Sequence, residues 1–192
     1  MSALEKAHRL LAPRIAYLVG TRTSDNSPNL IPVSNLTSIS TEPQQIAVAV
    51  YKQWETHKSL LTAGGFTVSV PHVEQLEGVW KLGAKYSHYP YSDNTDKIVA
   101  SGLSIDHGVC DYGPILSDGI GWAACQIVEK LDFGGNHGLY IGQIAHVHFN
   151  PTYLNPDGTP RGDVRPVMQI TGNAFTTASD THTVPYYTQS AT

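Results

Sequence analysis

Cysteine is nearly absent from this sequence: the only two are Cys110 and Cys125, and they lack the spacing of a disulfide framework. Cys125 stands inside an apolar run, where a small buried thiol is the ordinary interpretation. Residues Met1 to Leu11 are predicted to form a short amphipathic helix, and they lack the apolar stretch that an export signal requires. We therefore expect a protein of a reducing compartment, the cytoplasm.

Long apolar runs and an excess of positive charge are also missing. No segment approaches the roughly 20 apolar residues of a membrane-spanning helix, so no membrane partner is expected. The formal net charge is −4, whereas a nucleic-acid binder normally carries a basic face, so no nucleic-acid partner is expected. Neither repeats nor linkers divide the chain. We predict a single domain over 1–192, with its core at about 11–175 and a Thr/Ser-rich tail at 176–192.

Several common cofactor and catalytic motifs are absent as well. The glycines of 134–142 join two predicted strands rather than a strand and a helix, so they do not form a dinucleotide-binding motif. Neither a Gly-x-Ser-x-Gly elbow nor a Walker-type loop is present. His146 and His148 share one face of a predicted strand, but no carboxylate or cysteine has the spacing of a further ligand. No metal site is predicted.

What the sequence does contain is a series of β-type runs separated by turn residues. The runs predicted as strands are 14–23, 29–41, 45–51, 66–70, 121–133, 138–149 and 167–171. Shorter segments have helical spacing, namely 56–61 with Thr56 as N-cap, 73–82 and 95–100. Successive strands joined by hairpins favour an antiparallel barrel or sandwich with peripheral helices. The predicted fold class is mainly β.

Two segments have the residue types of a binding site. The run 32–43, rich in hydroxyl and amide side chains, follows a strand and can direct several donors at an anionic or ring-shaped ligand. An edge strand without a ligand is the alternative. Thr56, His57 and Lys58 lie at a predicted helix start, where unpaired backbone N–H groups and a cation attract a phosphate. The alternative is a helix cap followed by a solvated lysine.

The order of these segments resembles the flavin reductase-like, FMN-binding split-barrel family. The resemblance begins with Pro13–Val19, Asn29–Ser34 and Thr37–Pro43, and continues through Thr56-His57 and Gly65–Pro71. It extends over Asp96–Leu103, Asn136–Ile144, Arg165–Met168 and Gly172, and so covers roughly Leu11 to Phe175. No single motif is diagnostic, but order and spacing together are specific. The resemblance implies a six-stranded Greek-key barrel that binds FMN at its edge, between the two subunits of a homodimer.

The same resemblance implies roles for individual residues. Ser34, Asn35, Leu36, Thr37 and Ser38 are expected to line the isoalloxazine ring and the ribityl chain. Thr56, with His57 and Lys58 beside it, is expected to hold the FMN phosphate. Trp54 is expected to cover the ligand, with a place at a loop or subunit contact as the alternative. His137 is expected near the ring, where a reduced nicotinamide or another substrate approaches, and is the candidate catalytic residue.

Three features depart from the family pattern. Asn136 stands where many reductases of this family have Asp, which removes a carboxylate able to orient the imidazole and raise its basicity. Phe175 stands where Tyr is common. The stretch Tyr86 to Tyr91 is unusually aromatic and is interpreted either as a lid over the flavin or as a solvent-facing loop.

The leading hypothesis is therefore an oxidoreductase that passes hydride from NADH or NADPH to FMN, with FAD left open. The reduced flavin then serves a partner monooxygenase or another acceptor. The second hypothesis is an FMN-binding electron carrier or flavin-storage protein without a nicotinamide site. A third is a specialised small-molecule oxidoreductase in which Tyr86 to Tyr91 cover the substrate.

Overall fold

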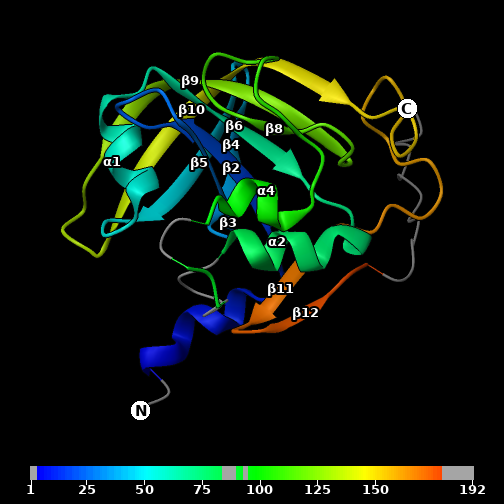
Figure 1. The fold of residues 1–192 in the computed structure, drawn as a ribbon, viewed down its shortest axis with the longest axis horizontal. Coiled ribbons are helices and arrows are strands. Elements are labelled where there is room, and N and C mark those ends of the chain that lie inside the picture. The colour runs from blue at the N-terminus through cyan, green and yellow to red at the C-terminus, as the bar shows by residue number, and fades with distance from the viewer. Residues whose placement is uncertain (1–3, 84–89, 93–94, 179–192) are drawn as a thin grey trace, which may run out of the picture.

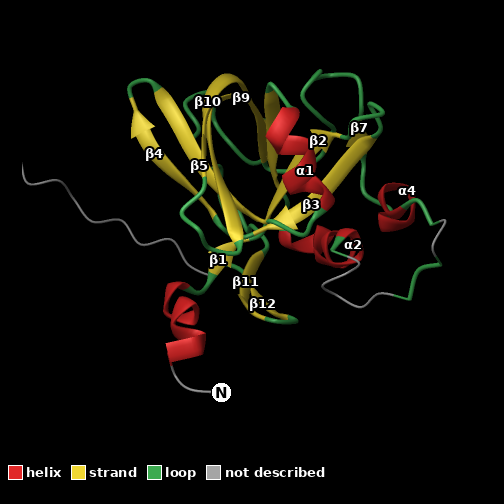
Figure 2. Ribbon diagram, turned by 90° about the vertical axis from the view of Figure 1, so that its left-hand side faces the viewer, coloured by secondary structure: helices red, strands yellow, loops and turns green. Residues whose placement is uncertain are grey.

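The computed structural model describes residues 4–83, 90–92 and 95–178 (Figures 1 and 2). Seven antiparallel strands form the larger sheet, in the order β3-β2-β6-β9-β10-β5-β4. In chain order these strands are β2 (Tyr17–Arg22), β3 (Pro28–Val33), β4 (Leu36–Thr41), β5 (Gln44–Tyr51), β6 (Gly65–Val70), β9 (Gly121–Leu131) and β10 (His137–Phe149). The mainly β, antiparallel prediction is confirmed.

Smaller elements surround this sheet. The strands β1 (Arg14–Ile15), β11 (Met168–Thr171) and β12 (Ala174–Thr176) form a second sheet, and β7 (Ile105–Asp106) pairs with β8 (Ile115–Leu116). The helices are η1 (Leu4–Leu11), α1 (Glu55–Thr62), η2 (Val73–Gln75), α2 (Leu76–Leu82) and α4 (Lys97–Ser101). The sheet of β1, β11 and β12 lies with η1 below the larger sheet in both views (Figures 1 and 2).

The larger sheet curls into a split barrel because of how its edge strands are connected. Strands β3 and β4 stand at opposite ends of the strand order, yet only Ser34 and Asn35 separate them in the chain. Since consecutive Cα atoms are about 3.8 Å apart, this link spans at most about 11 Å. The two edges must therefore approach each other. Within the described ranges no β-ladder joins β3 to β4, so the barrel stays open along this line.

Apolar side chains pack on both sides of the barrel wall. One core fills the interior and includes Val19, Phe66 and Tyr140. A second core lies between the outer face of the wall and the helices α2 and α4, and includes Leu18 and Leu30. Neighbouring Leu18 and Val19 are both fully buried because β2 is covered on its two faces. That explains the uninterrupted apolar run of this strand, which is typical of strands buried on both sides.

The structure refines the predicted elements in a few places. The run 29–41 is divided at Ser34–Asn35 into β3 and β4, which gives the larger sheet seven strands rather than the six that the resemblance implies. The helix predicted over 95–100 is α4, whose N-cap Asp96 accepts hydrogen bonds from the next turn. Residues 84–89 of the aromatic stretch and 179–192 of the tail lie outside the described residues. Of the helices described, none has the length and apolar composition needed to cross a membrane.

Candidate functional site

Two of the segments predicted at the ligand site, Ser34–Ser38 and the region of His137, meet the end of β5 at one edge of the barrel. Strand β5 lies between β4 and β10, and its last residue, Tyr51, pairs with His137 at the start of β10. On its other side β5 pairs with β4, and the Ala49 N–H donates to the Asn35 carbonyl oxygen at 2.9 Å. The Ser34–Asn35 link, the end of β5 and the start of β10 are therefore neighbours, although about 100 residues of chain separate the first from the last.

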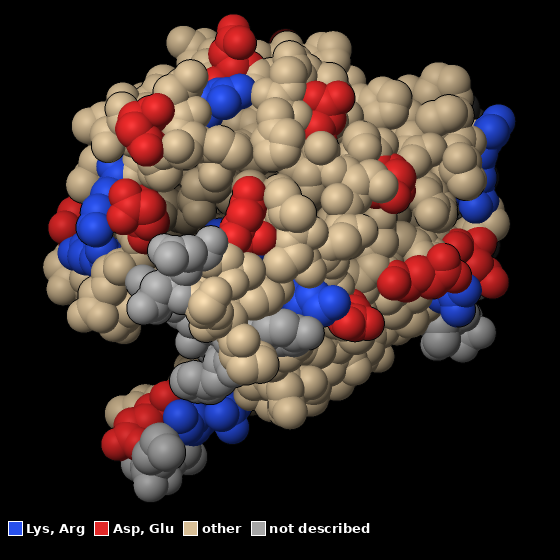
Figure 3. Space-filling view, in the orientation of Figure 1, with Lys and Arg blue, Asp and Glu red and all other residues tan. Residues whose placement is uncertain are grey.

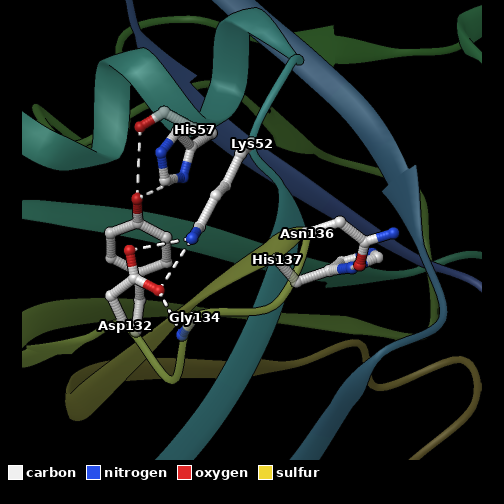
Figure 4. A network of polar contacts seen from close by, with 7 residues as sticks. Lys52, His57, Asp132, Gly134, Asn136 and His137 are labelled. Atoms are coloured by element: carbon white, nitrogen blue, oxygen red, sulfur yellow. Dashed lines mark hydrogen bonds and ion pairs between the residues drawn. The ribbon is translucent and has the colours of Figure 1, made fainter.

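His137 is held in one orientation at this edge. Its Nδ1 lies 2.7 Å from the side-chain oxygen of Asn136 (Figure 4). Its ring lies against Tyr51, with 5.5 Å between ring centroids. Because an amide oxygen can only accept, Nδ1 carries the proton and Nε2 keeps its lone pair. Burial lowers the pKa of His137, which favours the neutral ring. His137 therefore presents a hydrogen-bond acceptor to a ligand.

Trp54 joins this edge to the barrel interior. Its ring meets Tyr51 edge to face, with centroids 5.9 Å apart, and it packs against the interior core. Trp54 also precedes α1 and is the N-cap of that helix, without a side-chain capping bond. Tyr51, Trp54 and His137 thus form a continuous aromatic surface. The predicted role of Trp54 as a cover over the ligand stays a prediction.

Thr56 is not the helix cap that the sequence predicts, because α1 begins one residue earlier, at Glu55. Its side chain is only 1% exposed, and its hydroxyl accepts a hydrogen bond from Asn29 Nδ2 at 2.7 Å. The same Asn29 nitrogen lies 3.1 Å from the hydroxyl of Thr21. The Thr56 side chain therefore links α1 to the barrel wall, and its predicted role at the phosphate stays a prediction.

His57 and Lys58 point in different directions. His57 Nδ1 lies 2.7 Å from the Tyr140 hydroxyl, and Gly138 leaves room for the ring, since a Cβ there would lie 2.8 Å from His57 Cε1. Burial, then the charge of Lys52, lowers the pKa of His57, and burial raises that of Tyr140 to about 12. Lys58 is exposed and pairs with Glu55 at 3.0 Å. Of these two residues predicted beside the phosphate, His57 faces inward and Lys58 faces outward.

Lys52 is a member of this site that sequence reasoning missed. Its Nζ lies 2.7 and 2.8 Å from the two carboxylate oxygens of Asp132, which also accepts from the Gly134 N–H at 2.8 Å (Figure 4). The pKa of Asp132 is lowered, first by its hydrogen bond from Lys52. Because Lys52 and Asp132 are 80 positions apart, no local spacing indicates the pair.

The segment Ser34–Ser38 is supported from the second sheet. Arg14 Nη1 donates to Asn35 Oδ1 at 2.7 Å, and the Ser34 hydroxyl donates to Gln169 Oε1 at 3.2 Å. No carboxylate lies within ion-pair distance of Arg14 in the part of the chain that the structure describes. Its positive charge therefore remains available beside this segment. Arg14 and Gln169 are further residues that the sequence alone did not indicate.

A separate apolar groove lies further along the strands, away from His137, because its lining on β5 and β10 begins at Ile46 and Ile144. The groove has a volume of about 240 Å³, and Leu36 and Ser38 of β4 form part of its wall. Opposite them lie apolar side chains of the other strands, with Trp122 and Phe149 the largest of them. The described residues that line the groove include no Lys, Arg, Asp or Glu. A flat apolar ring fits such a wall better than a charged group does.

Elsewhere among the described residues, two histidines of β10 pack on an aromatic ring. His146 and His148 both lie against Trp122, with ring centroids 5.1 and 5.9 Å away. Among the described residues, no three His, Cys, Asp or Glu side chains come together as a metal would require. On the face shown in Figure 3, basic side chains are interspersed with acidic ones rather than gathered into one patch.

Comparisons with known proteins agree with this architecture. The family model "Flavin reductase like domain" matches residues 9–179. An uncharacterised protein of Archaeoglobus fulgidus is 27% identical over 170 residues, which cover 88% of this chain and 90% of that protein. An FMN-binding protein from Thermus thermophilus has a TM-score of 0.75 at 22% identity, covering 91% of this chain and 92% of that one. An NADH:FAD oxidoreductase from Streptomyces globisporus has a TM-score of 0.72 at 16% identity, covering 95% and 98%.

Proposed function

The chain belongs to the flavin reductase-like domain family, and we propose that it is an FMN-binding oxidoreductase that accepts hydride from NADH or NADPH. One observation carries this proposal. His137 is fixed beside Tyr51 at the edge where the Ser34–Asn35 link, β5 and β10 meet. A ring-shaped cofactor placed there has polar groups on one side and an oriented imidazole on the other.

The residues of this edge fit FMN in two respects. The segment Ser34–Ser38 offers hydroxyl and amide groups for the polar edge of the ring, with the charge of Arg14 behind it. The first turn of α1, with His57, offers backbone N–H groups for the phosphate. When bound, FMN supplies the hydride chemistry, and the protein supplies orientation and electrostatics.

His137 has a specific task in this proposal. With the proton held on Nδ1 by Asn136, its Nε2 accepts a hydrogen bond from a substrate donor such as the carboxamide N–H₂ of a nicotinamide. Burial lowers the pKa of His137, so the ring keeps this acceptor at neutral pH. The imidazole thus orients the hydride donor, and no covalent step by a side chain is needed. His137 is the candidate catalytic residue.

Steady-state oxidation of NADH and of NADPH with added FMN tests the proposal. We expect His137→Gln to lower kcat/KM for the nicotinamide by about tenfold, in proportion to the loss of an oriented hydrogen bond. The affinity for FMN, measured by quenching of flavin fluorescence, is expected to stay within about twofold because other residues hold the flavin. A His137→Gln protein with wild-type turnover would remove His137 from the mechanism. Repeating the assay with FAD establishes which flavin is used.

One observation favours a second function, an FMN-binding electron carrier or storage protein. Asn136 bonds to a neutral His137, whereas a carboxylate at this position would favour the charged imidazole. If the protein retains FMN after desalting but does not oxidise NADH or NADPH, this second function holds. The third proposal is a specialised small-molecule oxidoreductase in which Tyr86 to Tyr91 form a lid over the substrate. Residues 84–89 lie outside the described residues.

We also propose that two copies of the chain assemble. Strand β4 carries no Lys, Arg, Asp or Glu, and neither does the stretch 143–149 of β10. On these strands Ile39 and Val147 are nearly half exposed, and Phe149 is more than one-third exposed. A charge-free surface of this kind is typical of a contact between subunits.

A cytoplasmic location and a partner monooxygenase stay predictions. The free thiols of Cys110 and Cys125 support the cytoplasmic location.

A further inference from the structure

The turn between β9 and β10 determines where His137 lies. Residues 132–136 are all exposed, and Gly134 has a positive φ of 77°. An exposed turn with a glycine in the left-handed region has few contacts of its own and many accessible conformations. Yet Asn136, the last residue of this turn, must be placed to within a few tenths of an ångström to bond His137 Nδ1. Something outside the turn has to hold it.

Lys52 contacts both ends of this turn. Its side chain binds the first residue, Asp132, through two short contacts of 2.7 and 2.8 Å. Its backbone N–H binds the last residue, donating to the Asn136 carbonyl oxygen at 2.9 Å. Lys52 itself follows the rigid strand β5, which is paired on both sides. Figure 4 shows Lys52 reaching from the end of β5 to Asp132.

Asp132 is in turn fixed by the chain around it. Besides binding Lys52, its Oδ1 accepts from the Gly134 N–H at 2.8 Å, which closes the first half of the turn. The contacts thus run from β5 through Lys52 and Asp132 to Gly134, and from the Lys52 backbone to Asn136. The second path ends next to His137, and the first fixes the turn as far as Gly134. An exposed ion pair contributes little to overall stability, so stability alone gives this arrangement no special role.

We propose that Lys52, together with Asp132, is a positioning residue for His137. By holding both ends of the turn, Lys52 keeps the Asn136 amide against Nδ1 and so leaves Nε2 open toward the substrate. The inference deepens the proposed function and rests on it for the role of His137 at the substrate. The geometric part, the link from Lys52 to the orientation and tautomer of His137, does not depend on which reaction is catalysed.

The geometric part is tested in flavin-free protein by long-range proton–nitrogen NMR of the histidine rings. The two neutral tautomers differ in which ring nitrogen carries the proton, and His137→Gln identifies the signals of His137. In the wild type we expect the Nδ1–H tautomer to predominate. In Lys52→Met and Asp132→Asn we expect the ratio of the Nδ1–H tautomer to the Nε2–H tautomer to fall at least about fivefold, because the Nδ1–H tautomer then loses one hydrogen bond. Lys52→Arg, which retains a cation for Asp132, is expected to restore the wild-type signals.

Lys81→Met is the matched control. Lys81 is similarly shielded and pairs with Glu77 at 2.8 Å on α2. Its loss removes a comparable ion pair without touching the turn, so the His137 signals are expected to stay as in the wild type. A chain that fails to fold is recognised because its other histidine signals collapse as well. If folded Lys52→Met and Asp132→Asn retain the wild-type tautomer, the inference is overturned.

Kinetics provide the second readout. Lys52→Met is expected to raise the KM for the nicotinamide by about fivefold while the Kd for FMN changes less than about twofold, because the hydrogen bond to the substrate is lost and the flavin contacts are not. Asp132→Asn in the Lys52→Met background is expected to raise the KM no further, because both substitutions remove the same ion pair. Additive effects of the two substitutions contradict the inference. Wild-type turnover by His137→Gln would instead overturn the proposed function and leave the NMR result standing.

Discussion

Replacing Asn136 by Asp restores a carboxylate next to His137 and tests how the imidazole works. In the structure the Asn136 oxygen lies 2.7 Å from Nδ1, so a carboxylate at this position would meet the ring directly. Burial now lowers the pKa of His137. An adjacent negative charge favours the protonated ring, and Asn136→Asp is therefore expected to raise this pKa.

The size of the effect follows from distance and exposure. Two unit charges about 4 Å apart attract by about 4 kcal/mol at an effective dielectric constant of about 20, and by about 1 kcal/mol in bulk water. Asn136 is exposed and His137 is partly buried, so the lower part of this range applies. An attraction of about 1 to 2 kcal/mol changes the ratio of imidazolium to imidazole by about five- to thirtyfold.

Activity is expected to follow the protonation state. The neutral ring offers Nε2 as an acceptor, so kcat/KM for NADH or NADPH falls on the acid side as His137 takes up a proton. In Asn136→Asp this acid limb is expected at higher pH than in the wild type, with unchanged activity on the alkaline side. The assay is kcat/KM against pH, together with an NMR titration of His137.

Gly135→Asp is the matched control for this substitution. It adds the same charge to the same turn, and a Cβ at position 135 meets nothing within 4 Å. Without contact with His137, its effect on the titration is expected to be much smaller because solvent screens it. An acid limb that stays in place or moves to lower pH in Asn136→Asp, or an equal shift in Gly135→Asp, would refute the reasoning.

Three further substitutions test other parts of the account. Thr56→Val leaves Asn29 without one of its hydrogen-bond acceptors and is expected to lower the free energy of unfolding by about 1 to 3 kcal/mol. Circular dichroism is expected to show a fall in Tm of several degrees, while FMN affinity stays within about twofold. Thr56→Ser is the control, and an unchanged Tm with lost FMN binding contradicts the structural role. Gly138→Ala is expected to displace the His57 ring at a cost of about 1 to 3 kcal/mol, whereas Gly64→Ala, in open space, is expected to be neutral by the same assay. Ile39→Glu on β4 is expected to convert a dimer to a monomer in analytical ultracentrifugation, and an intact dimer would remove β4 from the interface.

The strands were predictable because their pattern is local. The predicted strands 66–70 and 121–133 are followed by Pro71 and Gly134, and the structure places β6 and β9 there. Strands β7, β8 and β12 are only two or three residues long, too short for any periodicity to appear. They form because β7 pairs with β8 and β12 pairs with β11 in the folded chain. The same holds for the division of 29–41, which follows from the curl of the whole sheet.

The candidate site was predictable only in part. The hydroxyl-rich segment and the helix start were found from their residue types, and His137 was found through the resemblance. The structure places Asn35 and His137 on opposite sides of β5. The supporting residues were not found, because Lys52 and Asp132 are 80 positions apart. Thr56 shows the opposite limit: its sequence context fits a cap, but the buried amide of Asn29 turns its hydroxyl into the molecule. Contacts of this kind depend on the folded chain.

Anaerobic mixing of the FMN-loaded protein with NADH or NADPH, followed through the visible absorption band of the flavin, tests the central claim most directly. The account predicts that FMN stays with the protein on desalting and that its band bleaches on addition of one of the two nicotinamides. Bleaching is expected to be slower by about tenfold in His137→Gln, because the hydride donor loses its oriented contact. A protein that retains no FMN and does not quench its fluorescence would contradict the account.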